Sequence, residues 1–261
     1  MDNILELKNI SSGYQGKIVI EDIDFKVKKG EFIGLIGPNG AGKTTLFKTL
    51  MGILKPEKGE ILYKERDLAG IDIKERAKRI AFLPQIFETR FSYTVEEFIT
   101  MGRFPHQDGL STYSKRDLER VKDVIERFSL TEIQGRRIDE ISGGELQRVL
   151  FAQSIAQDPE LLLLDEPTTH LDIGHQLDIM NAISDLNREG LTVITILHDL
   201  NISAEFCDRL ILMDKGRVVR DGEPSFVMDY SIIEEVYNAK VVIKENPYSG
   251  KPFLILYRNK A

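Results

Sequence analysis

The sequence predicts an α/β protein with a parallel-sheet core, an N-terminal antiparallel β-subdomain and an inserted helical subdomain. Two observations carry this prediction. Four short apolar runs, at residues 32–36, 80–83, 161–164 and 192–197, are flanked by helical patterns, as expected for strands buried on both faces of a parallel sheet. Other segments, such as residues 4–8 and 20–27, alternate apolar and polar side chains, which is the pattern of half-buried antiparallel strands.

The first buried run is followed by a glycine-rich loop. Residues 32–36 lead into the sequence Gly37-Pro38-Asn39-Gly40-Ala41-Gly42-Lys43-Thr44, and helix-forming residues continue to Lys48. A strand, a glycine-rich loop and a helix in this order are the context of a phosphate-binding P-loop. The core is therefore predicted to be that of a P-loop NTPase.

A helical insertion is expected in the middle of the chain. Residues 94–128 are charged and helix-forming with apolar spacing, interrupted by a polar loop at 103–112. We expect a mostly helical subdomain over about residues 86–158, between core strands.

The C-terminal end predicts a separate small element. A last helix over residues 231–238 precedes apolar runs at 240–243 and 253–257, with turn-forming residues 246–250 between them. This pattern indicates a terminal β-hairpin.

Composition excludes some classes of function. The 261 residues are 42% hydrophobic and 30% charged, with a net charge of −7, so nucleic acid is not an expected partner. The single cysteine, Cys207, cannot form an internal disulfide, and the first residues lack the features of a signal peptide. No stretch approaches the ~20 apolar residues that cross a bilayer. We expect a reducing, cytoplasmic location, with any membrane role supplied by a partner subunit.

The P-loop predicts nucleotide chemistry. Its glycines let backbone N–H groups close around phosphate oxygens, and the helix that follows adds its positive end. Lys43 would reach the terminal phosphates, and Thr44 would place its hydroxyl on Mg²⁺. The alternative is a glycine-rich turn that only happens to precede Lys-Thr. The candidate phosphate-binding residues are Gly37, Asn39, Gly40, Ala41, Gly42, Lys43, Thr44 and Thr45.

Two acids follow the third buried run. Asp165 and Glu166 end a segment too apolar to hold them unless they face the crevice where such sheets bind ligands. Asp165 would hold Mg²⁺, and Glu166 would polarise the attacking water. Alternatively, the two acids end a strand and meet solvent.

A third motif has two compatible interpretations. Ser142 and Glu145 have the spacing of a helix capping box, and Gly143 and Gly144 leave backbone N–H groups able to receive a second phosphate.

The order of these motifs resembles the ATP-binding subunits of ABC transporters. The resemblance runs from about Leu5 to residue 238 and includes a segment, Ser142-Gly143-Gly144-Glu145-Leu146-Gln147-Arg148, that is similar to the family's signature. It implies an ABC ATPase domain over residues 1–238, with 239–261 as a hairpin extension. It also implies a homodimer or pseudo-dimer in which ATP lies between the P-loop of one subunit and Ser142, Gly143 and Gly144 of the other.

Further site residues are implied by the resemblance. Tyr14 occupies the place of an aromatic that stacks on adenine, although an ordinary strand-edge tyrosine would look the same. Gln85 matches the glutamine that touches Mg²⁺ and the attacking water, and a surface glutamine is its alternative. Asp172 matches the loop that crosses the dimer interface. His198 matches the histidine that contacts the γ-phosphate, whereas a histidine after a strand is otherwise most often structural.

The sequence departs from the commonest pattern of this family at two positions. Glu145 stands where glutamine is frequent, and its charge could be offset by Arg148; Ile141 replaces leucine.

A metal site at His170 and His175 is not expected, because an i, i+5 spacing places them on different faces of a helix and no zinc-like cluster accompanies them.

Several segments are similar to the ATPases of importers for ferric siderophores, haem or cobalamin. They are residues 101–106, 169–176, 198–201, 207–209 and 222–224. The resemblance implies two integral membrane permease subunits and an extracytoplasmic substrate-binding protein as partners, and a place at the cytoplasmic face of the cell membrane. Another transporter class, or a soluble ABC ATPase without a transport role, are the alternatives.

The permease contact is expected near Gln85. Phe87, Phe91 and Phe104 would touch a cytoplasmic helix of the membrane subunit, or else pack within their own subdomain. Replacement of Phe91 by alanine is expected to uncouple transport from basal hydrolysis.

Overall fold

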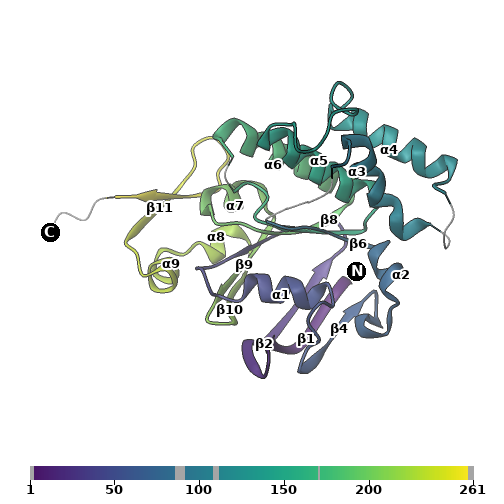
Figure 1. Ribbon diagram of the computed structural model, residues 1–261. Helices are drawn as coiled ribbons and strands as arrows, with labels where there is room; N and C mark the ends of the chain where they lie inside the picture. The colour runs from purple at the N-terminus through teal and green to yellow at the C-terminus, as the bar shows by residue number, and fades with distance from the viewer. Residues whose placement is uncertain (1–2, 86–91, 108–111, 170, 258–261) are drawn as a thin grey trace. The chain divides into compact units, whose positions relative to one another are not determined.

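A computed structural model describes residues 3–85, 92–107, 112–169 and 171–257 of the chain (Figure 1). It divides into two compact units, Met1–Gly70 with Ala182–Ala261 and Ile71–Asn181. Each unit is described by itself. The domain boundary at residue 238 and the insertion over 86–158 stay predictions.

The first unit contains the expected antiparallel sheet. Its strand order is β2-β1-β4-β5, with β1 at Asn3–Tyr14, β2 at Lys17–Lys28, β4 at Lys58–Tyr63 and β5 at Arg66–Asp67. Alternate residues of β2, including Ile23, Phe25 and Val27, are buried, as the two-residue period predicts.

The same unit holds parallel strands of the core. Strand β3 (Phe32–Ile36) pairs in parallel with β8 (Thr192–Ile196) on one side and β9 (Arg209–Asp214) on the other, and β10 (Arg217–Gly222) pairs antiparallel with β9. Every residue of β3 and β8 is buried, which confirms the interpretation of their apolar runs.

Helices pack on both sheets of this unit. Helix α1 (Lys43–Leu50) contacts β1 and β2, α7 (Leu200–Phe206) contacts β3, and α8 (Pro224–Val227) contacts β9. A short 3₁₀ turn, η1, spans Leu68–Gly70. Helix α9 (Tyr230–Tyr237) precedes β11 (Val241–Glu245) and β12 (Pro252–Leu256), which pair antiparallel and confirm the predicted hairpin.

The second unit combines a parallel strand pair with helices. Strands β6 (Ile80–Leu83) and β7 (Leu161–Asp165) pair in parallel, with Ile80 opposite Leu161. In the described chain, the elements between them are helical: α3 (Val95–Thr100), η2 (Met101–His106), α4 (Lys115–Arg127) and α5 (Gly143–Ala156). Helix α2 (Ile73–Ala77) precedes β6, and α6 (Ile173–Arg188) runs from this unit into the first.

Local sequence explains how these helices begin and pack. Thr94, Ser114 and Ser142 each start a helix with a complete capping box. Helix α4 buries Val121, Val124 and Ile125. Phe128 and Phe151 meet edge to face, with ring centroids 5.2 Å apart, which stabilises the helical unit by about 0.5–1.5 kcal/mol beyond simple burial. No helix of the described chain combines the length and the apolar character needed to cross a membrane.

Candidate nucleotide site

The P-loop is a tight connection between β3 and α1 that requires glycine at two positions. Gly37 has φ 144°, and a Cβ there would lie 2.1 Å from the backbone oxygen of Met213. Gly42 has φ 100°, and a Cβ there would lie 2.6 Å from Cγ2 of Ile20. Because Gly42 carries no side chain, α1 begins without a side-chain cap, and the backbone N–H groups of its first turn are suited to an anion.

Lys43 folds back over its own loop. Its side chain is buried, with 6% of the residue exposed, and Nζ donates to the backbone oxygens of Gly37 at 2.7 Å and Pro38 at 3.0 Å. Thr44 is exposed at the start of α1, whereas Thr45 is buried. The ammonium group is thus held at the loop by its own backbone.

The remaining loop residues differ in exposure. Asn39 and Gly40 are exposed, and Ala41 is buried. The backbone oxygen of Ala41 accepts a hydrogen bond from the amide of Gly216, in the β9–β10 turn, at 3.1 Å. The β9–β10 turn therefore holds the backbone of the P-loop at Ala41.

Tyr14 ends β1 with 40% of its surface exposed. Nζ of Lys48, on α1, lies 5.5 Å from the centroid of its ring, within reach of a cation–π interaction. Stacking on adenine and a plain strand-edge position are both compatible with this placement.

In the second unit, Glu166 directly follows β7 in a strained conformation. Its φ of 53° is left-handed, which costs a residue with a side chain about 1–3 kcal/mol. The carboxylate accepts hydrogen bonds from Nε2 of Gln85 and from Oγ1 of Thr169, the latter at 3.0 Å. Asp165, the last residue of β7, is 5% exposed. The structure thus brings together Gln85 and Glu166, which the sequence named separately.

Ser142 caps α5 as its spacing predicted. Oγ donates to Oε2 of Glu145 at 2.7 Å, and the Glu145 amide donates back to Oγ at 3.3 Å. Hydrogen bonds from the Ser142 backbone and hydroxyl, with Arg136 and Arg148 nearby, hold the pKa of Glu145 below its usual value. Glu145 is therefore ionised at neutral pH, at a helix end that is otherwise suited to a phosphate.

His175 joins two of the predicted site segments. Its amide and its Nδ1 both bond the carboxylate of Asp172 at 2.9 Å, and these bonds lower the pKa of that carboxyl. Its ring lies against Gly144, where an added Cβ would be 3.0 Å from Cδ2. Sequence reasoning placed His175 in an importer-like segment and did not expect it to bind a metal, and it missed this contact. His170 lies outside the described residues.

His198 is exposed at the point where β8 ends and α7 begins. It lines an open cavity of about 550 Å³ together with Tyr237 and residues of α7 and β12.

Tyr237 is a second residue that the sequence did not single out. Its hydroxyl lies buried beside the backbone of Gly37, without a well-formed hydrogen bond to a described residue. Burial raises the pKa of this hydroxyl, and the neighbouring Gly37 backbone partly offsets that effect. The end of α9 therefore touches the start of the P-loop.

Known proteins are similar to this chain over nearly its whole length. Residues 20–169 match the ABC transporter family. The iron(3+)-hydroxamate import ATP-binding protein FhuC of Bacillus subtilis (strain 168) is 37% identical over 98% of this chain and 95% of its own length. The hemin import ATP-binding protein HmuV of Pseudomonas aeruginosa is 38% identical over 97% of this chain and 99% of its own length.

Solved structures agree with the sequence comparisons. One described as a metal-chelate type ABC transporter in an inward-facing conformation has a TM-score of 0.86 and 26% identity, covering 98% of each chain. A bacterial ABC transporter cassette, MJ0796, solved as a dimer, has a TM-score of 0.74 and 27% identity, covering 84% of this chain and 98% of its own. This chain therefore belongs to the ABC transporter family, as one of its ATP-binding subunits.

Proposed function

We propose that this chain is the ATP-hydrolysing subunit of an importer that takes up a metal chelate, namely a ferric siderophore, haem or cobalamin. The observation that carries the proposal is the similarity to hydroxamate and hemin import subunits over almost the full length of both proteins. The chain would act at the cytoplasmic face of the membrane with two permease subunits, which receive the chelate from an extracytoplasmic binding protein.

ATP would be held by the P-loop of one copy and the α5 terminus of a second. Backbone N–H groups at Gly40 and Gly42 and the ammonium group of Lys43 supply the positive lining that phosphates require. Tyr14 would stack on the base. Ser142, Gly143 and Gly144 would come from the second copy, and its Asp172 loop would border the interface.

The candidate magnesium ligands have suitable chemistry. Thr44 offers an exposed hydroxyl and Asp165 a carboxylate, and donation from Nε2 to Glu166 leaves Gln85 its amide oxygen. These hard oxygen donors fit Mg²⁺. When bound, Mg²⁺ would neutralise charge on the β- and γ-phosphates.

Glu166 is the proposed general base. Its left-handed backbone and its bonds to Gln85 and Thr169 restrict where the carboxylate can point. A held carboxylate can orient a water and accept its proton as the water attacks the γ-phosphorus and ADP leaves, while His198 would contact the γ-phosphate.

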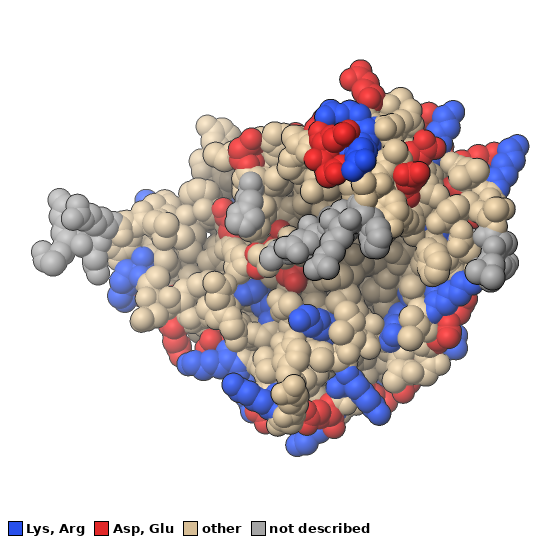
Figure 2. All heavy atoms as spheres, in the orientation of Figure 1, with Lys and Arg blue, Asp and Glu red and all other residues tan. Residues whose placement is uncertain are grey.

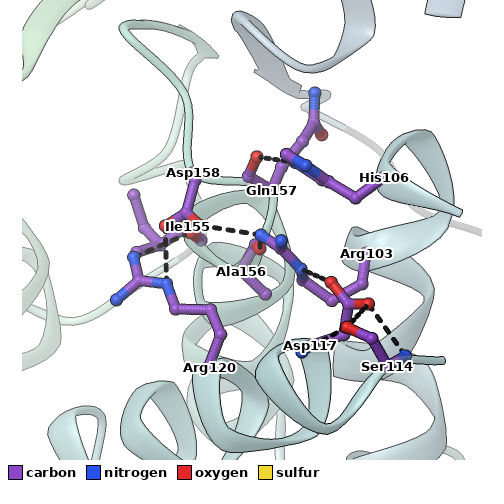
Figure 3. A network of polar contacts seen from close by, with 9 residues as sticks. All are labelled: Arg103, His106, Ser114, Asp117, Arg120, Ile155, Ala156, Gln157 and Asp158. Carbon is purple, nitrogen blue, oxygen red and sulfur yellow. Dashed lines mark hydrogen bonds and ion pairs between the residues drawn. The ribbon is translucent and has the colours of Figure 1, made fainter.

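Coupling to a permease is proposed at η2. Phe104 is 68% exposed, which supports a partner contact over packing within the subdomain. Its neighbour Arg103 is buried and donates to Asp117, Asp158 and the backbone oxygen of Ala156, while His106 bonds the backbone oxygen of Gln157 (Figure 3). This network fixes the exposed Phe104 to α4 and to the end of α5. Phe87 and Phe91 lie outside the described residues.

Nucleic acid remains an unexpected partner. Figure 2 shows Lys and Arg side chains interspersed with Asp and Glu over the visible face, and the net charge is −7. Mixed charge of this kind does not favour a polyanion.

Uptake in cells tests the proposed function. Cells that lack this protein are given labelled ferric siderophore, haem or cobalamin, and are rescued with the wild type or with Glu166→Gln. We expect uptake of one of the three ligands to be lost and to be restored by the wild type alone. Unchanged uptake of all three would contradict the proposed substrate class, and rescue by Glu166→Gln would contradict the role of Glu166.

A further inference from the structure

The C-terminal hairpin lies between two segments that border the candidate site. Strand β11 contacts α9 and strand β12 contacts α7, at the yellow end of the chain in Figure 1. At the α9 side, Glu234 accepts hydrogen bonds from Nζ of Lys240 at 2.6 Å and from the Val241 amide at 3.1 Å. The hairpin is therefore attached at its first strand.

Asn201 attaches the second strand to the first turn of α7. Its Nδ2 donates to the backbone oxygen of Leu254 at 3.1 Å, and its Oδ1 accepts from the Leu254 amide at 2.7 Å. The Asn201 side chain thus bonds both the backbone N–H and the backbone C=O of Leu254. A neighbouring strand would bond an edge strand such as β12 in the same way. The primary amide of Asn201 offers a donor and an acceptor on separate atoms, as this pairing with both groups of Leu254 requires.

Glu205 makes a second attachment at the last turn of α7. Its Oε2 accepts from Oγ of Ser249 at 2.7 Å and from Nδ2 of Asn246 at 3.3 Å, both in the hairpin turn. The hairpin therefore holds α7 at both of its ends. We call the contacts of Asn201 and Glu205 with the hairpin the α7 clamp.

Helix α7 begins immediately after His198. Asp199 caps it, accepting hydrogen bonds from the amides of Asn201 at 2.8 Å and Ile202 at 3.0 Å. Asn201 therefore bonds the cap through its backbone and the hairpin through its side chain. A shift of the hairpin would move the first turn of α7 and, with it, the backbone of His198.

The space around these contacts is open. The cavity of about 550 Å³ lies among His198, Tyr237, α7 and β12. The buried face of α7, with Ser203 and Ala204, packs within the first unit, whereas on the side of the cavity the polar contacts with the hairpin hold its first turn. Removal of one side chain should therefore have a measurable effect.

The hairpin is also connected to the P-loop through α9. Helix α9, which carries Glu234, ends in Tyr237, whose hydroxyl lies beside the backbone of Gly37. The first unit thus contains a continuous path from Gly37 through α9, the hairpin and α7 to His198.

We infer that the C-terminal hairpin positions His198 through the α7 clamp, with Asn201 as the principal positioning residue. The inference rests on the proposed function, which assigns His198 to the γ-phosphate. Asn201 would set the orientation of His198 for hydrolysis without contacting the nucleotide. Its loss should therefore lower kcat and leave the affinity for ATP intact.

The purified chain tests this inference with two independent readouts. Asn201→Ala removes both bonds to Leu254, and Asn201→Asp keeps the size and the acceptor but loses the donor. Amide hydrogen exchange is measured over residues 198–206, and kcat, KM and the affinity for a fluorescent ATP analogue are measured in parallel. Tyr248→Ala is the matched control, because Tyr248 is 98% exposed in the same hairpin turn and makes no described side-chain contact with α7.

For Asn201→Ala we expect exchange in the first turn of α7 to rise about tenfold, the scale of one or two lost hydrogen bonds. We expect kcat to fall by about three- to tenfold, with KM and analogue affinity within about twofold of wild type. Asn201→Asp should be intermediate, and Tyr248→Ala should match the wild type.

Unchanged exchange in Asn201→Ala would overturn the clamp, and a fall in ATP affinity equal to the fall in kcat would overturn the positioning role. A wild type that binds ATP but does not hydrolyse it would refute the proposed function instead, and the exchange measurement would still decide whether the clamp exists.

Discussion

Arg103 carries a charge in the interior of the helical unit, with 4% of the residue exposed. Its buried partner, Asp117, has a carboxylate oxygen 2.9 Å from Nε, and the carboxylate of Asp158 lies 2.8 Å from Nη1. A buried pair of this kind stabilises a fold less than its geometry suggests, because both charges lose water. Removal of Arg103 would leave the Asp117 carboxylate buried without its cation, at a cost of about 3–5 kcal/mol. The sequence marked Arg103 as part of an importer-like segment, and the structure gives it this internal role.

The pair predicts a dependence of stability on pH. Burial alone would raise the pKa of Asp117, but hydrogen bonds from Ser114 and Arg103 outweigh it, so the folded pKa is lowered. A lowered pKa gives stability that is present above the unfolded value, about 3.9, and is lost as pH falls through the folded value. The difference in unfolding free energy between wild type and Asp117→Asn should therefore shrink as pH falls from 6 to about 3.

Urea unfolding at a series of pH values measures this difference. Asp123→Asn, an exposed position on the same helix, is the control and should show no such trend. A constant difference between wild type and Asp117→Asn across the range would contradict the role assigned to the Asp117 carboxylate.

At the scale of elements, the N-terminus of α5 combines two roles that oppose one another. The capping box stabilises the helix, but it places the ionised Glu145 where the proposed function requires a phosphate. Glutamine at this position can still complete a capping box, and it removes the negative charge. Glu145→Gln should therefore leave the melting temperature almost unchanged and lower KM for ATP by a few-fold.

Steady-state hydrolysis and thermal melting of the purified protein check this pair of expectations. Glu126→Gln, on the exposed side of α4, controls for a change in net charge alone. If KM were the same in Glu145→Gln and wild type, the α5 terminus would not approach the phosphate of a second copy.

The sequence predicts well those elements whose apolar residues follow one another along the chain. The runs that became β3, β7 and β8 are short and predominantly apolar, so their burial could be foreseen. Strand β9 was not foreseen, because Arg209 and Asp214 shorten its apolar stretch. Arg209 is accommodated at the edge of the core by ion pairs with Glu31 and Asp221, which no local pattern reveals.

The same distinction applies to the site. The P-loop glycines follow from local backbone geometry, and their positions could be predicted. The bond between Gln85 and Glu166 joins residues 81 positions apart, and that between Asn201 and Leu254 spans 53. Motifs placed these residues in a series, but only the fold shows which of them touch.

At the scale of the whole molecule, the proposed function requires a second copy of the chain to complete the site. In the proposed arrangement, ATP binding draws two copies together and hydrolysis releases them, so a chain that binds ATP without hydrolysing it should remain dimeric. Glu166→Gln meets this condition, because glutamine keeps the size of the side chain and its bond capacity but cannot accept the proton of the attacking water. We expect it to lower kcat by about 10²–10⁴-fold. Light scattering with size-exclusion chromatography, with and without ATP and Mg²⁺, measures the outcome.

Lys43→Ala should stay monomeric under the same conditions, because it lacks the ammonium group for the phosphates. A Glu166→Gln protein that binds ATP but stays monomeric would contradict the shared site, and one that hydrolyses ATP at the wild-type rate would show that another group activates the water.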